Sequence, residues 1–330
     1  MIDEATLYDV LPQALDTFDM PELGTPFKGK VRDLYRVTRH KRHKLVLITT
    51  DRLSAFDRVL GLVPYKGQIL NELSAFWFRH CEDIVGNHLI ATPDPNITVA
   101  RVATPLPVEV VVRGYLTGVT KTSLWYRYDT LGERTIYGYE LPDGLEKDQP
   151  LPEPLLTPTT KGGPTGHDER LTVDEVTERG LVKPALWQQI QDVALALFRR
   201  GQEVAAQQGL VLVDTKYEFG TLENGGLVLI DEIHTPDSSR YWRADSLQSG
   251  TPVHLDPVHL DKEFVRLAYA DEGYRGDGPP PPLSPDLAVQ TSLRYQELFE
   301  TLTGRNFGGA TYPAEPRIRQ VLMARYLDGL

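Results

Sequence analysis

A predicted β-hairpin in the second half of the chain constrains the fold more than any other segment. It consists of the run LVLVDTKYEF at residues 210–219, the turn ENGG at residues 223–226 and the apolar return LVLI at residues 227–230. Asparagine and glycine between two runs of β-branched, aliphatic and aromatic residues favour antiparallel pairing. The chain is therefore expected to contain an antiparallel sheet.

The first strand of this hairpin carries a row of charged side chains. Side chains alternate across a strand, so Asp214, Lys216 and Glu218 share one face, and the residues between them are mainly apolar. Asp231 directly follows the second strand, and strand pairing could bring its carboxylate near this row. Mg²⁺ commonly takes one or two carboxylates together with water and nucleotide phosphate oxygens. The alternative is a solvated strand face whose salt bridges contribute little.

The segment that follows the hairpin, HTPDSSRYW at residues 234–242, combines hydroxyls, a carboxylate and an arginine. The guanidinium of Arg240 can bind phosphate through two hydrogen bonds, and Asp237 and Ser238 can complete the recognition of a phosphate and a ribose. Alternatively, Asp237 or Ser238 caps a helix that contains Arg240.

A glycine-containing turn is predicted near the N-terminus, in FKGKVRDLY at residues 27–35. Gly29 permits close approach of the backbone to a ligand, and Lys30 and Arg32 can offset nucleotide charge. The sequence contains neither GxxxxGK[ST] nor GxGxxG, so an ordinary turn is the alternative.

Two further predicted strands end in polar residues, where ligand groups are often held on a rigid scaffold. The strand at residues 44–50 leads into TDRLSAFD, whose candidate residues are Asp51, Arg52, Ser54 and Asp57. The strand at residues 108–113 ends at Arg113 after three valines. A charge at that position needs a partner, which is either a substrate phosphate or an internal carboxylate.

The remaining elements indicate an α+β protein, because a sheet-rich first half is followed by a helix, a hairpin and further helices. A segment rich in proline, glycine and threonine at residues 141–168 predicts a long loop. Another strand is expected at residues 97–103, separated from the one at 108–113 by two prolines. Helices are expected at residues 69–81, 184–208, 261–270, 285–302 and 316–326.

The composition excludes several classes of protein. The formal net charge of −11 argues against a general binder of nucleic acid or of anionic membranes. A single cysteine excludes an intrachain disulfide and a cysteine-rich zinc site, and it favours a reducing, cytoplasmic location. The N-terminal residues show no secretory pattern, and no apolar run is long enough to span a bilayer.

Six motifs together resemble the SAICAR synthetase family, the phosphoribosylaminoimidazole-succinocarboxamide synthases of purine biosynthesis. They are GKVRDLY (29–35), TDRLSAFD (50–57), PVEVVVRGYLTG (107–118), LLTPTTK…GHDE (155–169), LVDTKYEFG (212–220) and DEIHTPDSSRYW (231–242). They occur in the family's order and span most of the chain. One departure lies after Gly118, where the four residues VTKT precede Ser123. The simplest alignment makes Ser123 the family's substrate-phosphate serine, and Thr120 or Thr122 could replace it.

The resemblance implies an ATP-dependent ligase that joins L-aspartate to the carboxylate of carboxyaminoimidazole ribonucleotide, giving SAICAR, ADP and phosphate. Because an amine does not displace oxide from a carboxylate, an acyl phosphate intermediate is expected. The family fold is an ATP-grasp-like or kinase-like two-lobed α+β architecture with ATP between the lobes. It implies an ATP-binding lobe at residues 1–114 and a lobe with the metal and ribonucleotide site at residues 115–330. A different kinase-like phosphotransferase and a non-catalytic nucleotide-binding module are the alternatives.

Carried over residue by residue, the resemblance also implies roles for the candidates. The ATP phosphates and Mg²⁺ are assigned Gly29, Lys30, Arg32, Glu218 and Asp231, the last two as metal ligands. The ribonucleotide is assigned Arg113, Ser123, Asp237, Ser238 and Arg240. Lys216 is expected near the reacting carboxylate, with Asp214 orienting it or the imidazole. The loop with Asp51, Arg52, Ser54 and Asp57 is assigned to the aspartate and imidazole side. The expected partners are these small molecules, without nucleic acid or membrane, and a homo-oligomer is compatible with the sequence.

Overall fold

The computed structural model describes residues 1–39, 42–161, 168–247 and 257–327. The chain forms two compact units, and neither is a continuous segment, because the chain returns to the first unit near its C-terminal end. The first unit contains Met1–Arg79, His88–Val102 and Phe264–Leu330, and the second contains His80–Asn87 and Ala103–Glu263. The lobes predicted from the sequence, by contrast, are continuous and meet at residue 114. Their assignment to ATP and to the ribonucleotide stays a prediction.

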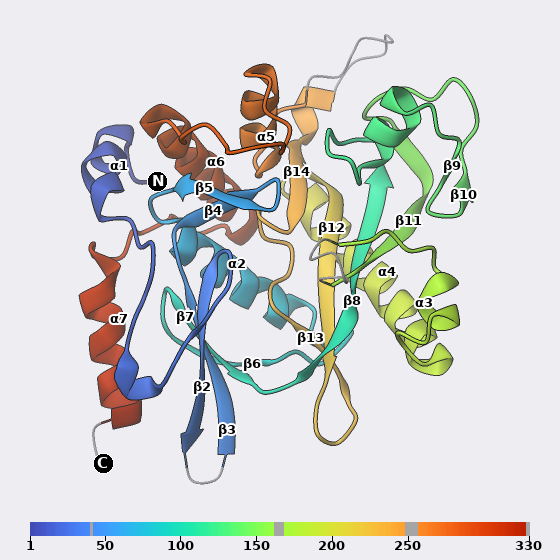
Figure 1. Ribbon diagram of the computed structural model, residues 1–330. Helices are drawn as coiled ribbons and strands as arrows, with labels where there is room; N and C mark the ends of the chain where they lie inside the picture. Colours follow the sequence, from blue (N-terminus) through green and yellow to red (C-terminus); the bar gives the residue numbers. More distant parts are fainter. Residues whose placement is uncertain (40–41, 162–167, 248–256, 328–330) are drawn as a thin grey trace. The chain divides into compact units, whose positions relative to one another are not determined.

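The first unit is built on a five-stranded antiparallel sheet in the order β1-β2-β3-β7-β6 (Figure 1). Strand β3 lies in its centre, because its run of leucine, valine and isoleucine suits a strand that is covered on its faces. A separate hairpin, β4–β5, follows it along the chain. The strands are β1 (Phe27–Lys28), β2 (Arg32–Arg39), β3 (Arg42–Thr49), β4 (Arg52–Ala55), β5 (Arg58–Leu62), β6 (Leu89–Asp94) and β7 (Ile97–Arg101).

Helices complete the first unit and contribute to its apolar cores. Ile318 and Leu322 of α7 pack against a sheet face that includes Tyr35, Val46 and Val99. A second core joins the β4–β5 hairpin to α5 and α6. No helix in the described part of the chain is long and apolar enough to cross a membrane. The helices are α1 (Glu4–Val10), α2 (Lys66–His80), α5 (Glu263–Asp271), α6 (Pro285–Thr303) and α7 (Ala314–Leu322).

The second unit is built on the sheet β11-β8-β12-β13, with β14 paired to another part of β12. The long helix α4 packs against it: Phe198 approaches Gly114 of β8, and Gly201 lies close to Leu212 of β12. Figure 1 shows β8, β11, β12 and α4 grouped in this way. The elements are β8 (Thr104–Tyr115), β9 (Thr135–Ile136), β10 (Tyr139–Glu140), β11 (Pro150–Thr160), α3 (Glu175–Glu178), α4 (Pro184–Gln207), β12 (Leu210–Thr221), β13 (Leu227–Ile230) and β14 (Ser239–Arg243).

Most predicted elements are present, and the α+β class is confirmed. The hairpin is β12 and β13, with residues 222–226 as the connection. The helix predicted at residues 184–208 is α4, and the one at 285–302 is α6. Both carry apolar residues at three- and four-residue spacing, and proline stands at the first turn of each.

Two predictions that rested on proline are wrong. Residues 141–168 are not one long loop, because β11 occupies Pro150–Thr160. Residues 162–167, which belong to that predicted loop and to the fourth motif, lie outside the described residues. Strand β8 begins at Thr104, so Pro105 and Pro107 lie within it. Both proline stretches lie at an edge of the sheet. Strand β11 is the outer strand, and residues 104–107 of β8 have no partner in β11, which pairs with β8 only from Val108 onward.

Candidate functional site

The charged row of β12 forms an ion-pair network with β8. Glu218 stands opposite Glu109 in the strand register, and Lys216 lies one step away on the same face. The Lys216 ammonium donates to Glu109 Oε1 at 2.9 Å and to Glu218 Oε1 at 2.7 Å. Lys161, just after β11, pairs with the second oxygen of Glu218. Two lysines therefore share one largely buried carboxylate.

This arrangement shifts the pKa values of its members in opposite directions. Burial disfavours the charged form of Lys216, but Glu218 and Glu109 outweigh it and raise the pKa of this lysine well above its ordinary value. Burial opposes ionisation of Glu218 as well, and the two lysines outweigh it, so the pKa of Glu218 is lowered. Burial raises the pKa of Glu109, and Glu218 adds to this effect. Glu218 is therefore the firmly ionised carboxylate of the network.

Asp231 lies at the end of the adjacent strand β13. Ile230 pairs with Glu218, so Asp231 begins the segment that leaves the sheet next to the charged row. Its backbone has a φ of 67°, and its charge contributes to the raised pKa of Lys216. Within the described ranges, no group of three or more histidine, cysteine or acidic residues has a metal-binding arrangement. Two carboxylates completed by phosphate and water fit the usual coordination of Mg²⁺.

A second cluster centres on Asp214. In the register of the sheet, Asp214 stands opposite Arg113 of β8 on one side and Arg240 of β14 on the other. Its Oδ2 forms an ion pair with Arg240 and lies 3.6 Å from Arg113 Nη1. Arg240 also contacts Glu263 at 3.1 Å. Burial disfavours the charged form of Arg240, but Asp214 and Glu263 outweigh it and raise the pKa. The internal carboxylate that was the alternative partner of Arg113 is therefore present as Asp214, and Arg240 shares this carboxylate.

The turn after β8 brings Ser123 to this arginine cluster. Gly118 has a φ of 97°, and a Cβ placed there would lie 2.6 Å from Ser123 Cβ and 2.9 Å from Arg240 Nη2. Ser123 is buried, and its hydroxyl lies 2.8 Å from the Thr120 hydroxyl and accepts from the Thr120 N–H at 3.2 Å. The carbonyl of Thr122 accepts from Arg113 at 3.3 Å. Ser123 and Arg240 therefore converge around Gly118, with Thr120 holding the serine.

Asp237 and Ser238 lie in the turn that leads into β14. Ser238 Oγ accepts from the N–H of Thr235 at 3.2 Å, and Asp237 lies 3.6 Å from the ammonium of Lys262. The alternative that either residue caps a helix containing Arg240 is wrong, because Arg240 lies in strand β14. The turn instead ties the segment after β13 to the sheet through backbone and hydroxyl hydrogen bonds.

A buried histidine supports this segment from the opposite face of β12. His234 Nε2 lies 2.6 Å from the hydroxyl of Tyr217, and the His234 carbonyl accepts from the hydroxyl of Tyr241. Burial lowers the pKa of His234 to about 3. The imidazole is therefore neutral at ordinary pH, and it fixes the position of the chain between Asp231 and Arg240.

In the first unit, Arg52 shapes the glycine-containing turn. The Gly29 N–H donates to the Arg32 carbonyl at 2.8 Å, which closes the turn. The guanidinium of Arg52 donates to the carbonyls of Gly29 and Lys30 at 3.0 Å each, and it pairs with Asp33 at 2.8 Å. Arg32 is largely buried, and Lys30 is exposed. The Arg52 side chain therefore holds the backbone of the glycine-containing turn in place.

The other loop candidates divide between buried and exposed positions. Asp51 is fully buried and accepts from the N–H groups of Leu15 at 2.7 Å and Gly67 at 2.8 Å. It also accepts from the Tyr312 hydroxyl at 2.7 Å. Asp57, with a φ of 64° in the β4–β5 turn, forms an ion pair with Lys30. Ser54 is buried in β4. Two side chains of this loop therefore reach the glycine-containing turn: Arg52 contacts its backbone, and Asp57 contacts Lys30.

Glu109 and Lys161 are the two members of the charged network that the sequence analysis did not identify. Glu109 and Arg113 lie four residues apart on β8 and therefore on the same face of the strand. The two-residue alternation that predicted the charged row on β12 could thus have identified Glu109 as well. Lys161 lies within the segment predicted to be a loop, so no local pattern placed it beside β12.

The fold and these clusters define an α+β protein whose second sheet carries paired basic and acidic groups suited to an anionic, phosphorylated ligand. The chain belongs to the SAICAR synthetase family, because the sequence model of that family matches residues 26–281. The match begins just before the glycine-containing turn and covers both charged clusters.

Relatives with assigned names agree with this membership. A phosphoribosylaminoimidazole-succinocarboxamide synthase of Legionella pneumophila is 46% identical over 299 residues, covering 90% of this chain and 93% of that protein. The chloroplastic synthase of Arabidopsis thaliana is 45% identical and covers 91% of this chain and 72% of that protein. The solved SAICAR synthase of Saccharomyces cerevisiae complexed with SAICAR has a TM-score of 0.73 at 30% identity, covering 90% of this chain and all of that one.

Proposed function

We propose that this protein is a SAICAR synthetase that joins L-aspartate to the carboxylate of carboxyaminoimidazole ribonucleotide, with conversion of ATP to ADP and phosphate. The observation that carries the proposal is the register of the second sheet. It places Arg113 and Arg240 on either side of Asp214, and Glu109 opposite Glu218, within a chain that belongs to this family. One cluster can bind the phosphate of a ribonucleotide, and the other can hold the reacting groups.

The reaction requires activation of a carboxylate. A carboxylate oxygen of the ribonucleotide attacks the γ-phosphorus of ATP, the bond to ADP breaks, and an acyl phosphate forms. The neutral amine of aspartate then attacks the acyl carbon, inorganic phosphate leaves, and the nitrogen loses a proton. Phosphoryl transfer of this kind depends on positioning and charge stabilisation, without a protein nucleophile. Lys216 is assigned to the reacting carboxylate, because its ammonium is held charged by Glu109 and Glu218.

Glu218 and Asp231 are the proposed ligands of Mg²⁺. When bound, the metal would neutralise charge on the nucleotide phosphates. Glu218 is paired with both Lys161 and Lys216, so a divalent cation held there would share this carboxylate with two ammonium groups. Lys216 is also paired with Glu109, at 2.9 Å. These contacts keep the Lys216 ammonium charged for the substrate carboxylate that is assigned to it.

The ribonucleotide phosphate is assigned to Arg113, Ser123 and Arg240. Arg240 is anchored by two carboxylates, which fixes its planar donor groups. Gly118 leaves the space in which Ser123 and Arg240 approach each other. Asp237 and Ser238 are assigned to the same ligand, in the turn before β14. Asp214 orients both arginines, which is a role distinct from the expected orientation of Lys216.

ATP phosphates are assigned to the turn with Gly29, Lys30 and Arg32 in the first unit. Arg52 contributes by holding the carbonyls of that turn, and the buried Asp51 fastens the preceding strand end to Gly67. Asp57 and Ser54 remain the candidates for the aspartate and imidazole side. A cytoplasmic location and a homo-oligomeric state also stay predictions.

A coupled assay of ADP formation tests the proposal. We expect ADP formation with the ribonucleotide, ATP and Mg²⁺ to depend on L-aspartate, with one SAICAR formed for each ADP. ADP formation at the same rate with and without L-aspartate would identify another phosphotransferase. Nucleotide binding without turnover would identify a non-catalytic module. In the variant Asp214→Asn the arginine cluster loses its central negative charge. This variant should bind the ribonucleotide more weakly and bind ATP as before.

A further inference from the structure

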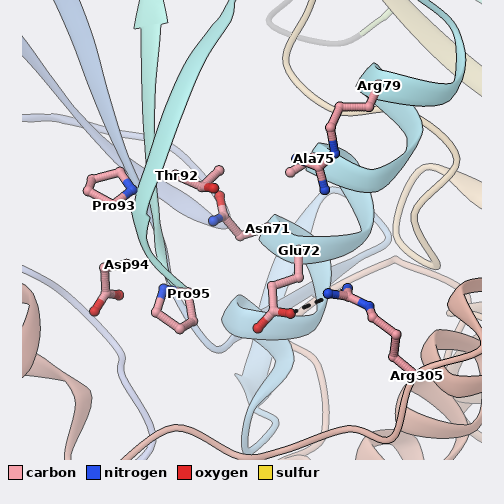
Figure 2. Close-up of a pocket in the computed structure, with 9 residues that line it drawn as sticks. All are labelled: Asn71, Glu72, Ala75, Arg79, Thr92, Pro93, Asp94, Pro95 and Arg305. Atoms are coloured by element: carbon pink, nitrogen blue, oxygen red, sulfur yellow. Dashed lines mark ion pairs between the residues drawn. The ribbon is translucent and has the colours of Figure 1, made fainter.

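The C-terminal segment that follows α6 runs along the first half of α2. Arg305 lies 3.7 Å from Glu72, and Figure 2 shows this ion pair beside the helix. One turn earlier in α2, the Gln68 side chain donates to the Gly308 carbonyl at 3.0 Å and accepts from the Ala310 N–H at 2.9 Å. The segment therefore follows the helix back toward its N-terminal end.

Tyr312 of this segment lies beside the first turn of α2. Its hydroxyl accepts from the Tyr65 N–H at 2.6 Å and donates to Asp51 Oδ2 at 2.7 Å, and its ring centroid lies 4.4 Å from that of Tyr65. Burial raises the pKa of the Tyr312 hydroxyl well above its ordinary value, and Asp51 adds to this effect, so the hydroxyl stays protonated and donates. Tyr312 lies beyond residues 26–281, which the family's sequence model matches, whereas Asp51 lies within them.

Asp51 receives hydrogen bonds on both of its carboxylate oxygens. Its side chain is fully buried, with the Gly67 N–H on Oδ1 at 2.8 Å. The Leu15 N–H donates to Oδ2 at 2.7 Å, beside the Tyr312 hydroxyl. Burial raises the pKa of Asp51, and the hydrogen bond from Tyr312 is the largest of the contacts that oppose this effect. The carboxylate therefore holds parts of the protein together, and Tyr312 is the donor that stabilises its charge most.

The residues on either side of Asp51 connect it to the glycine-containing turn. Arg52 donates to two carbonyls of that turn at 3.0 Å each. The Thr50 N–H donates to the Val31 carbonyl at 3.0 Å, and the Thr50 hydroxyl donates to the same carbonyl at 2.9 Å. A displacement of Asp51 would therefore move both of its neighbours, and with them the backbone of the turn.

We propose that Tyr312 is a positioning residue for ATP binding, which acts by holding Asp51 and thereby the glycine-containing turn. This inference rests on the proposed assignment of that turn to the ATP phosphates. The Tyr312 hydroxyl contacts Asp51 and Tyr65, so its effect on the turn has to pass through Asp51. The residues assigned to the ribonucleotide phosphate belong to the second unit, so loss of the hydroxyl should change ATP binding selectively.

Isothermal titration of the full chain with ATP and Mg²⁺, without the other substrates, tests this role. Tyr312→Phe keeps the ring but removes the hydrogen bond to Asp51. It should weaken ATP binding by about tenfold, because the turn is in its binding conformation less often. Affinity for the ribonucleotide, titrated separately, should change less than about twofold. Tyr8→Phe is the matched control, because it removes a tyrosine–aspartate hydrogen bond of 2.6 Å, to Asp286, in the same unit. It should leave both affinities unchanged.

Gln68→Met provides a second variant, which decides the matter if thermal unfolding shows that Tyr312→Phe does not fold. It keeps Tyr312 and Asp51 but removes both hydrogen bonds to residues 308–310, so ATP binding should again weaken selectively. Unchanged ATP affinity in the folded variant, or an equal loss of affinity for ATP and the ribonucleotide, would overturn the proposal. SAICAR formation is measured separately, so a selective loss of ATP binding in a protein that forms no SAICAR would contradict only the proposed function.

Discussion

Replacement of Gly118 by alanine tests the proposed phosphate site most directly. Gly118 has a φ of 97°, and the added Cβ would press on the Ser123 hydroxyl and lie 2.9 Å from Arg240 Nη2. Both neighbours are buried and held by other contacts, so neither can move away without losing a partner. The substitution should therefore displace the two proposed phosphate donors together.

The expected magnitude follows from the bonds at risk. A hydrogen bond from Ser123 to a charged phosphate oxygen is worth about 1.5–3 kcal/mol. Loss of that amount corresponds to a rise of roughly 10- to 150-fold in the KM for the ribonucleotide, when KM follows affinity. Backbone strain at positive φ adds about 1–2 kcal/mol to the cost of folding, which lowers the melting temperature without distinguishing the substrates.

Gly144→Ala is the matched control for this strain. Gly144 has a φ of 82° in the same unit, and a Cβ there would meet no atom within 4 Å. Initial rates measured over a range of each substrate should show a selective rise in the ribonucleotide KM for Gly118→Ala, with the ATP KM little changed. An unchanged ribonucleotide KM, or the same change in both variants, would refute the assignment of this turn.

The remaining predictions concern four other sites. Ser123→Ala should raise the ribonucleotide KM by at least about tenfold, and Thr120→Val should have a smaller effect; the reverse order in initial-rate measurements would reassign the phosphate donor to Thr120. Glu218→Gln should reduce turnover severely with the circular dichroism spectrum retained, and full activity at ordinary Mg²⁺ would exclude its role as a metal ligand. Arg240→Lys keeps the charge but loses the planar guanidinium, so titration of the folded variant should show a larger loss of affinity for the ribonucleotide than for ATP. The pKa of His234 falls from 6.5 when unfolded to about 3 when folded, so protonation favours unfolding; between pH 6 and 4 the free energy of unfolding should fall by about 1.4 kcal/mol per pH unit on this account, and urea unfolding of His234→Gln should show a shallower dependence.

Local periodicity was sufficient to predict the charged row of the second unit. The alternation of Asp214, Lys216 and Glu218 with apolar residues sets their common face, and the hairpin turn sets their proximity to Asp231. Both properties depend on residues close together in sequence. The α+β class follows from the same kind of information, because each helix and strand carries its own pattern.

The partners of these residues depend on contacts between distant segments. Asp51 resembles a ligand group at a strand end, yet its hydrogen bonds come from Leu15, Gly67 and Tyr312, which no local pattern connects. Lys161 reaches Glu218 only because a proline-rich segment pairs as a strand. Strand formation there is decided by a neighbouring strand rather than by intrinsic propensity.

The proline content of β11 also protects the sheet from unwanted association. The outward-facing backbone groups near its end are occupied, since the Pro158 carbonyl accepts from the Leu171 N–H and the Thr160 N–H donates to the Glu169 carbonyl. Pro158 has the same alternation as Thr160 in the regularly paired part of the strand, so β11 lacks an N–H at a position that would face outward. An incoming strand from another molecule would find few donors to pair with, and this edge is a poor template for aggregation.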